Sequence, residues 1–245
     1  MQNPEREWFG TRKVSAREKT DLVRGVFDSV ADKYDLMNDL MSGGRHRLWK
    51  DRFVRQIRPR PGMKCLDVAG GTGDIAFRLK RKGAQVTVSD INEEMLRVGR
   101  DRAIDRGWLA LEWVPANAED LPFDDESFDL YTIAFGLRNV THIDKALAEA
   151  ARVLKPGGKF FCLEFSRVEE PFIAKIYDAW SFNVIPRIGA AVAKDRESYQ
   201  YLVESIRKFP PQKQLVRRMA AAGLSQCRYT NLDFGVVAIH QGVKV

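Results

Sequence analysis

Cysteine and histidine are scarce in this sequence, with three of each among 245 residues. The cysteines are far apart and stand mostly among apolar neighbours, and no C-x-x-C pair occurs (Cys65, Cys162 and Cys227). A disulfide-stabilised small domain needs an even set of closely spaced cysteines, and a structural zinc site needs Cys or His ligands in paired spacing. The sequence therefore argues against both and predicts no metal site.

Long apolar runs are also lacking. No segment approaches the roughly 18 consecutive apolar residues that a membrane-spanning helix requires, and residues 1–13 have no apolar core of the kind found in a secretory signal. The hydrophobic fraction of 44% is ordinary for a folded globular protein and excludes whole-chain disorder. We expect a reduced, cytoplasmic protein.

Acidic residues are scarce in one stretch only. Residues 45–60 contain seven Lys or Arg and one Asp, which gives +6 of the formal net charge of +7. The remaining 229 residues contain 33 basic and 32 acidic side chains. The chain is therefore a near-neutral domain with one basic strip, unlike a uniformly basic nucleic-acid-binding protein.

Strand and helix patterns alternate from about residue 61. Strands are expected at 63–69, 85–90, 110–115, 128–135 and 159–165, with helices at 74–82, 93–106 and 144–154. Asn92 occupies an N-cap position, and Gly83 and Gly107 stand where helices should end. Such alternation predicts a parallel sheet covered by helices on both faces.

The end of the chain breaks this alternation. After a helix at 212–222, strands at 226–232 and 236–241 are separated by only three residues, which allows a hairpin but no crossover. The sequence therefore predicts an α/β fold with a seven-stranded sheet whose last strand is antiparallel.

Two regions lie outside the alternation and are interpreted as lids. Residues 14–58 are expected to be helical throughout and to form an N-terminal cap. Residues 167–208 form an aromatic-rich insertion at the carboxyl edge of the strands, where α/β sheets bind ligands. With a cofactor-binding core at 61–166 and a helix and hairpin at 209–245, we expect one domain over 1–245.

The first strand leads into a glycine-rich loop, 66–74 (LDVAGGTGD). Its glycines allow a tight turn beside a helix N-terminus, as in dinucleotide sites. Asp67, however, would repel a pyrophosphate, whereas it suits the ammonium and sulfonium groups of S-adenosylmethionine. Asp90, at the end of the second strand, is placed to accept hydrogen bonds from ribose hydroxyls, and Asn117 could contact the adenine.

Blocks along most of the chain then resemble the ubiquinone/menaquinone biosynthesis C-methyltransferases, a family of class I methyltransferases with a Rossmann-like fold. The blocks are 23–27 (VRGVF), 34–39 (YDLMND), 46–50 (HRLWK), 66–74, 135–140 (FGLRNV) and 152–158 (RVLKPGG). The 34–39 and 135–140 blocks are the specific ones. Two positions depart from the general pattern: Ala69 replaces the first loop glycine, and Ala134 stands where many relatives have serine.

The resemblance implies transfer of a methyl group from S-adenosylmethionine, without a metal, to a ring carbon of a polyprenylated quinol. The cofactor-binding residues that we expect are Asp67, Gly71, Thr72, Gly73, Asp90, Asn117, Ala118 and Ala134. The ring becomes nucleophilic when its hydroxyl is deprotonated, so Arg138 should stabilise the anion while Asn139 donates a hydrogen bond. Tyr34 is expected either to contact the substrate or to belong to the core. His142 could relay a proton or cap a helix.

Three other functions are alternatives to methylation of a quinol. A methyltransferase acting on oxygen or nitrogen of another lipophilic molecule would share the fold. A basic RNA- or DNA-binding protein would use the 45–60 strip. Nucleic-acid methyltransferases that act on bases often have an N-P-P-Y-like site after the fourth strand, where this chain has AFGL at 134–137, so no nucleic-acid partner is expected. A nicotinamide-dependent dehydrogenase is disfavoured by Asp67.

The basic strip has an interpretation that fits a lipid substrate. Leu48, Trp49, Phe53 and Ile57 recur at helical spacing, which leaves the basic residues on the other faces. Such a helix either rests on an anionic membrane at the inner face or is simply solvated. Residues 179–193 form a tail channel, a membrane contact or a packed lid helix. Other quinone-biosynthesis enzymes and a second copy of the chain are further candidate partners.

Overall fold

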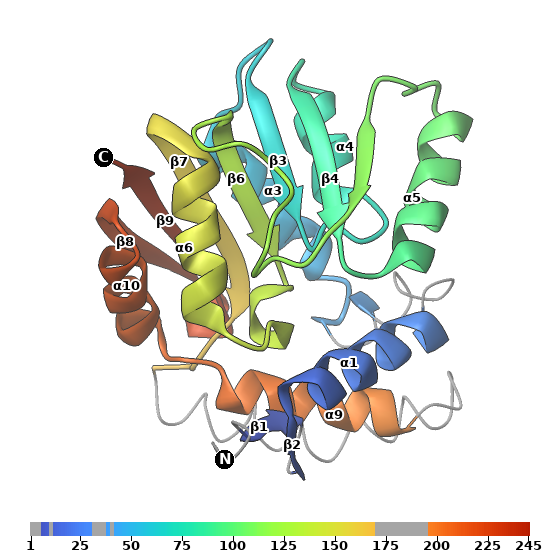
Figure 1. Ribbon diagram of the computed structural model, residues 1–245, viewed down its shortest axis with the longest axis vertical. Coiled ribbons are helices and arrows are strands. Elements are labelled where there is room, and N and C mark those ends of the chain that lie inside the picture. The colour runs from blue at the N-terminus through green and yellow to red at the C-terminus, as the bar shows by residue number, and fades with distance from the viewer. Residues whose placement is uncertain (1–5, 10–11, 31–37, 40–41, 170–195) are drawn as a thin grey trace.

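The computed structural model describes residues 6–9, 12–30, 38–39, 42–169 and 196–245 (Figure 1). Its main sheet has seven strands in the order β5-β4-β3-β6-β7-β9-β8. The strands are β3 (Lys64–Val68), β4 (Gln85–Asp90), β5 (Glu112–Pro115), β6 (Phe128–Ala134), β7 (Leu154–Phe165), β8 (Leu224–Leu232) and β9 (Val237–Lys244). The strands from β3 to β7 pair in parallel, whereas β9 is antiparallel to β7 and β8. The expected α/β sheet with an antiparallel last strand is confirmed.

Helices cover both faces of this sheet. They are α3 (His46–Ile57), α4 (Asp74–Lys80), α5 (Glu93–Asp105), α6 (Ile143–Val153) and α10 (Gln212–Ala221). The predicted caps are present: the Asn92 side chain accepts a hydrogen bond from the Met95 amide at 2.9 Å. Gly83 and Gly107 have φ of +83° and +69° after α4 and α5, as helix-ending glycines do.

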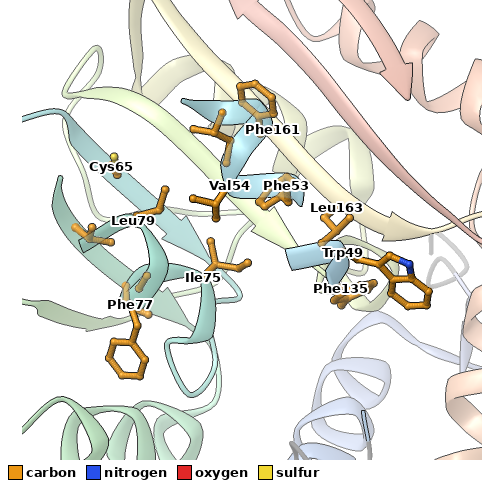
Figure 2. Packing of buried hydrophobic residues seen from close by; sticks show 14 of the residues in the cluster. Trp49, Phe53, Val54, Cys65, Ile75, Phe77, Leu79, Phe135, Phe161 and Leu163 are labelled. Carbon is orange, nitrogen blue, oxygen red and sulfur yellow. The ribbon is translucent and has the colours of Figure 1, made fainter. Parts of the chain in front are cut away.

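The core is divided between the two faces. On one face, α6 and α10 cover apolar residues of β3, β6 and β7. On the other, α3 and α4 pack against the same sheet, and Figure 2 shows Trp49, Phe53 and Val54 beside Phe161 and Leu163 of β7. The ring centroids of Phe53 and Phe161 are 6.1 Å apart in an edge-on arrangement. Helix α3 is therefore part of the core that supports the sheet.

The carboxyl ends of the parallel strands are covered by a further group of elements. They are β1 (Arg6–Phe9), β2 (Arg12–Ser15), α1 (Ala16–Val30) and α9 (Arg196–Lys208), which lie below the sheet in Figure 1. Tyr201 of α9 stacks on Phe9 of β1 with ring centroids 4.3 Å apart. Residues from the two ends of the chain thus meet over the ligand-binding edge of the sheet.

Two details of the expected secondary structure and one expected position on a helix face were wrong. Residues 14–58 are not helical throughout, because Val14 and Ser15 belong to β2, which pairs with β1. Strand β7 begins at Leu154 rather than at residue 159. Leu154 pairs with Phe128 and Lys159 pairs with Leu130, so the intervening turn-like residues of β7 form a bulge within the strand. Leu48 is 63% exposed, because it lies about 100° around the helix from buried Trp49.

Several expectations fall outside the described residues. Tyr34, residues 179–193 and most of the 167–208 insertion belong to this part of the chain. Of the insertion, residues 167–169 and helix α9 are described, and α9 lies at the carboxyl edge as expected. None of the described helices is long and apolar enough to span a membrane.

Candidate functional site

A pocket opens at the carboxyl edge of the sheet, where the ends of β3, β4 and β6 meet the residues after β5. Four of the predicted cofactor residues line it: Gly71, Asp90, Asn117 and Ala118. Asn139 of the short helix η2 (Leu137–Asn139) lines it too, and Thr20, Val23 and Arg24 of α1 close one side. Residues that are distant in sequence are therefore brought to one site by the strand order.

The loop after β3 takes its shape from backbone conformations that glycine favours. Gly71 and Gly73 have φ of +53° and +83°. A Cβ on Gly73 would lie 2.7 Å from Trp113, so a larger residue there would need Trp113 to move. Ala69, which replaces a glycine of the general pattern, also has a positive φ of 49°. A non-glycine residue in this region is strained, and such strain is often found at functional sites.

Asp90 is the acidic side chain that faces the pocket from the end of β4. Its carboxylate accepts hydrogen bonds from the backbone amides of Gly71 at 2.8 Å and Asn92 at 2.9 Å. Burial raises the pKa of this carboxyl to about 6, although the amides oppose the shift. Ile91 and Met95, which also line the pocket, place apolar surface beside it. A carboxylate next to an apolar slot can accept hydrogen bonds from a diol while a flat ring packs alongside.

Asp67 lies behind the pocket lining, not in it. It is 1% exposed, accepts hydrogen bonds from the Thr132 hydroxyl at 2.7 Å and the Ala76 amide at 3.1 Å, and so joins β3 to β6 and α4. Burial raises its pKa to about 7. The other predicted cofactor residues outside the lining are Thr72, Gly73 and Ala134. Their role toward a cofactor stays a prediction.

Arg138 forms a buried ion pair with Glu164 of β7. Its Nη1 atom donates to Glu164 Oε1 at 2.7 Å and to the Phe135 carbonyl at 2.6 Å. Glu164 is fully buried, and burial raises its pKa although the charge of Arg138 opposes this. The Nε atom of Arg138 is buried and has no acceptor among the described residues. The guanidinium is thus held at one edge and has a donor left over at the other.

Arg138 faces a second cavity, of about 610 Å³, beside the first. Asn139 lines the first cavity, while Val140 and Thr141 line both, so the two cavities adjoin at η2. The Tyr201 hydroxyl donates to Asn139 Oδ1 at 3.1 Å, which fixes the amide from the α9 side. A ligand in the second cavity would therefore meet both Arg138 and a ligand in the first.

His142, a candidate proton relay, caps α6 by position. Its Nδ1 atom lies 2.6 Å from Glu119 Oε2, and its side chain is 24% exposed. This contact orients the loop after η2, and His142 lines the second cavity, so its role as a proton relay stays a prediction.

Several site residues were missed from the sequence. Glu164 had a usable signal, because an acid within the apolar strand sequence FFCLEF must have a buried partner. Ile91 and Met95 follow Asp90 directly and could have been assigned to the same pocket. Tyr201 and the α1 residues had no such signal, since their position depends on how two helices fold back over the sheet.

Solved structures with a similar fold support the architecture. A SAM-dependent methyltransferase from Aquifex aeolicus matches 85% of this chain and 97% of its own, with a TM-score of 0.60 and 18% identity. The [4+2]-cyclase SpnF matches 88% of this chain and 94% of its own, with a TM-score of 0.64 and 19% identity. At this identity the likeness concerns the fold alone, and the cyclase illustrates that one fold hosts different chemistries.

Sequence relatives are much closer. The ubiquinone/menaquinone biosynthesis C-methyltransferase UbiE of Brucella canis is 57% identical over 97% of this chain and 90% of its own. The protein of the same name from Brucella anthropi is 56% identical over 97% of this chain and 92% of its own. The profile of the ubiE/COQ5 methyltransferase family matches residues 13–244. With the fold and the paired cavities described above, this match over nearly the whole length means that the chain belongs to the ubiE/COQ5 methyltransferase family.

Proposed function

We propose that this enzyme transfers a methyl group from S-adenosylmethionine to a ring carbon of a polyprenylated quinol, in ubiquinone or menaquinone biosynthesis. The acceptor is 2-methoxy-6-polyprenyl-1,4-benzoquinol, demethylmenaquinol or both. The observation that carries the proposal is the guanidinium of Arg138, which is held by Glu164 and lines a cavity next to the pocket of Asp90. The names of the close relatives support it.

The first pocket fits a nucleoside cofactor. Asp90 would accept the ribose hydroxyls, Ile91 and Met95 would flank the adenine, and Asn117 and Ala118 would contact its edge. Gly71 and its neighbours would let the amino-acid part approach the backbone. Asp67, when ionised, would favour the positive charge of the cofactor from behind the loop, because its Oδ2 atom lies beside Gly70 of that loop. When bound, S-adenosylmethionine supplies an electrophilic methyl group on a sulfonium.

The second cavity would hold the quinol ring. A quinol hydroxyl that loses its proton to water pushes electron density into the ring, and the guanidinium of Arg138, which lines this cavity, would stabilise the resulting oxyanion. Asn139 would align the ring at the junction of the two cavities. Since Arg138 is paired with Glu164, it acts as an oriented donor whose local charge is largely balanced.

The covering elements would exclude water from a reaction that destroys two opposite charges. Helices α1 and α9 are such covers, and we propose that 14–58, apart from α3, which packs in the core, and 167–208 act as lids within a single domain spanning 1–245. Tyr34, in the part of the chain that is not described, remains a predicted substrate contact.

A polyprenylated substrate would reside in a bilayer, so we further propose that the enzyme works at the cytoplasmic face of a membrane. The basic strip 45–60 would face anionic lipid. Other quinone-biosynthesis enzymes or a second copy of the chain would be additional partners.

The test is a methylation assay with purified protein, labelled S-adenosylmethionine and each of the two quinols, read out by mass spectrometry of the ring. Arg138→Ala alone would leave Glu164 buried without its partner and could unfold the protein. The informative variant is therefore Arg138→Met combined with Glu164→Gln. We expect kcat to fall about a hundredfold or more, with unchanged affinity for S-adenosylmethionine.

The matched control is Arg152→Met, which removes an ion-paired arginine that lines neither cavity. Near-normal turnover in the double variant would show that Arg138 does not activate the ring. Methylation on oxygen or nitrogen, or of neither quinol, would contradict the proposed reaction itself.

A further inference from the structure

We propose that Phe234 and Leu48 form an apolar wedge that inserts into the surface of an anionic bilayer and holds the open side of the site against it. The proposal rests on the proposed function in one respect, that the acceptor is a lipid. It goes beyond the basic strip, because the wedge combines α3 with the β8–β9 turn, which lies at the other end of the sequence.

Phe234 has a backbone conformation that is strained for a bulky residue. It lies in the short turn η4 (Asp233–Gly235), where Asp233 and Phe234 have φ of +46° and +59°. Bulky residues rarely adopt this left-handed region. This strained conformation does not serve to bury the side chain, because Phe234 is 72% exposed. A strained turn that presents an aromatic ring to solvent indicates a binding role.

The turn is fixed to α3 by a clamp on Asp233. The guanidinium of Arg45 donates to both carboxylate oxygens at 2.7 and 2.6 Å, and the Trp49 indole N–H donates to Oδ2 at 2.6 Å. Leu48 lies between these two residues in sequence and is 63% exposed. The clamp therefore places the exposed Phe234 and the exposed Leu48 on neighbouring elements that hold each other rigidly.

Basic side chains surround this wedge. Arg45 and Arg47 have side-chain exposures of 59% and 61%, and Arg52 and Arg55 on the next turns of α3 are exposed as well. The nearby acids, Asp39, Asp51 and Asp233, each accept from an arginine. Apolar residues with arginines around them match the interface of an anionic bilayer, where apolar insertion and attraction to phosphate act together.

The wedge lies at the same edge of the sheet as the active site. The turn η4 follows Leu232, which pairs with Val237, and Val237 pairs with Phe165 at the carboxyl end of β7. Trp49, which clamps the turn, lies 6.4 Å from Phe135 between ring centroids, and Phe135 lines the cofactor pocket. Insertion at Phe234 would therefore bring the pocket side of the molecule to the lipid.

A bilayer is favoured over a protein partner because of the size and form of the patch. Stable protein interfaces bury roughly 800 Å² on each partner around a packed apolar centre, whereas two protruding residues among arginines supply little flat apolar surface. Membrane insertion needs only a few such residues in addition to charge.

The test measures co-sedimentation with vesicles of phosphatidylcholine, with and without phosphatidylglycerol. We expect the wild type to bind the anionic vesicles and to be released by salt. Phe234→Asn combined with Leu48→Gln should weaken binding about tenfold, and Asn tolerates the left-handed conformation, so the turn should persist. The matched control is Leu109→Gln, which removes a still more exposed leucine (78%) from another part of the surface.

Activity gives the second measurement. Turnover of a long-chain demethylmenaquinol in anionic vesicles should fall with binding, whereas turnover of a short-chain, water-soluble analogue should stay unchanged. Equal vesicle binding by variant and wild type would overturn the wedge, as would an equal loss on the short-chain analogue. Lipid-free self-association that the variant abolishes would assign the patch to a second copy and also overturn it. If the wild type methylates neither quinol, the proposed function fails while vesicle binding still tests the wedge.

Discussion

Arg138 lies at the site as one half of an ion pair with Glu164. A substitution of Arg138 alone therefore also changes the surroundings of Glu164. A sequence shows the arginine after a strand and the acid within the next strand, but not that their side chains meet at 2.7 Å. The place of Arg138 at the ligand edge could be predicted because it follows β6. The partial neutralisation of its charge could not, because it depends on the register between β6 and β7.

Asp90 should make cofactor binding depend on pH. Its pKa in the free protein is raised to about 6 by burial, and hydrogen bonds from ribose hydroxyls would favour the charged form. The contribution of Asp90 to the affinity for S-adenosylmethionine should therefore be constant above about pH 7. Below pH 6 it should fall up to tenfold for each pH unit as the carboxyl becomes protonated. Calorimetric titration from pH 5 to 8 measures this.

The variant for this prediction is Asp90→Asn, which keeps the size of the side chain but cannot titrate. We expect affinity at pH 7.5 to fall roughly tenfold to a hundredfold, which corresponds to losing about 1.5–3 kcal/mol of charge-assisted hydrogen bonding. The dependence on pH between 5 and 7 should become flatter. An unchanged pH profile would mean that another group, such as Asp67, controls binding.

At the level of helices and strands, the elements that could be predicted were those with clear ends. Helix α5 has Asn92 at its start and Gly107 beyond its end, and strand β4 was predicted with its observed bounds, Gln85–Asp90. The β1–β2 hairpin was missed because its strands have four residues each and pair only with one another. A strand of four residues is too short to show a recognisable alternation of apolar and polar residues.

The β8–β9 hairpin contains a buried histidine that should make its stability depend on pH. His240 is fully buried, and burial lowers its pKa from 6.5 to about 4. Between these values the unfolded chain binds the proton and the folded protein does not, so stability falls as pH decreases from 6.5 toward 4. The total loss from this residue should be about 3 kcal/mol.

Urea unfolding of the wild type and of His240→Gln at several pH values separates this effect from that of the carboxyl groups. The variant should lose less stability than the wild type between pH 6.5 and 4, whatever its stability at pH 7.5. Parallel curves for the two proteins would mean that His240 is protonated in the folded state or that the hairpin opens locally to admit the proton.

For the whole molecule, the α3 helix is an integral part of the fold rather than an appended cap. Lys50 is 4% exposed, and its Nζ atom lies 2.6 Å from Asp74 Oδ2 at the start of α4. Although burial alone would raise it, the charges of Lys50 and Arg78 lower the pKa of Asp74 to about 2. The class of fold could be predicted from the order of strands and helices. The contact between Lys50 of α3 and Asp74 of α4 could not, because the basic strip that contains Lys50 has the composition of a solvent-exposed helix.

Lys50→Met should lower the free energy of unfolding by about 2–3 kcal/mol, since Asp74 keeps Arg78 as its remaining partner. We expect one cooperative transition in urea for both proteins, as a single domain requires. Arg52→Met, on the exposed side of the same helix, should change stability by less than about 0.5 kcal/mol. Two transitions, with α3 unfolding first, would contradict the single-domain proposal.

The clamp between Arg45 and Asp233 also has a consequence for how the chain is made. The two residues are separated by 188 positions, and the side-chain amide of Gln56 in the same helix lies 2.8 Å from that of Gln241, 185 positions away. During synthesis, α3 leaves the ribosome long before the hairpin that holds it. Its apolar face, with Trp49 and Phe53, packs on Phe165 and Phe161 of β7 and must remain uncovered until that strand emerges. The nascent chain is therefore open to chaperones over much of its translation, and a truncation that removes the C-terminal hairpin should weaken the docking of a helix near the N-terminus.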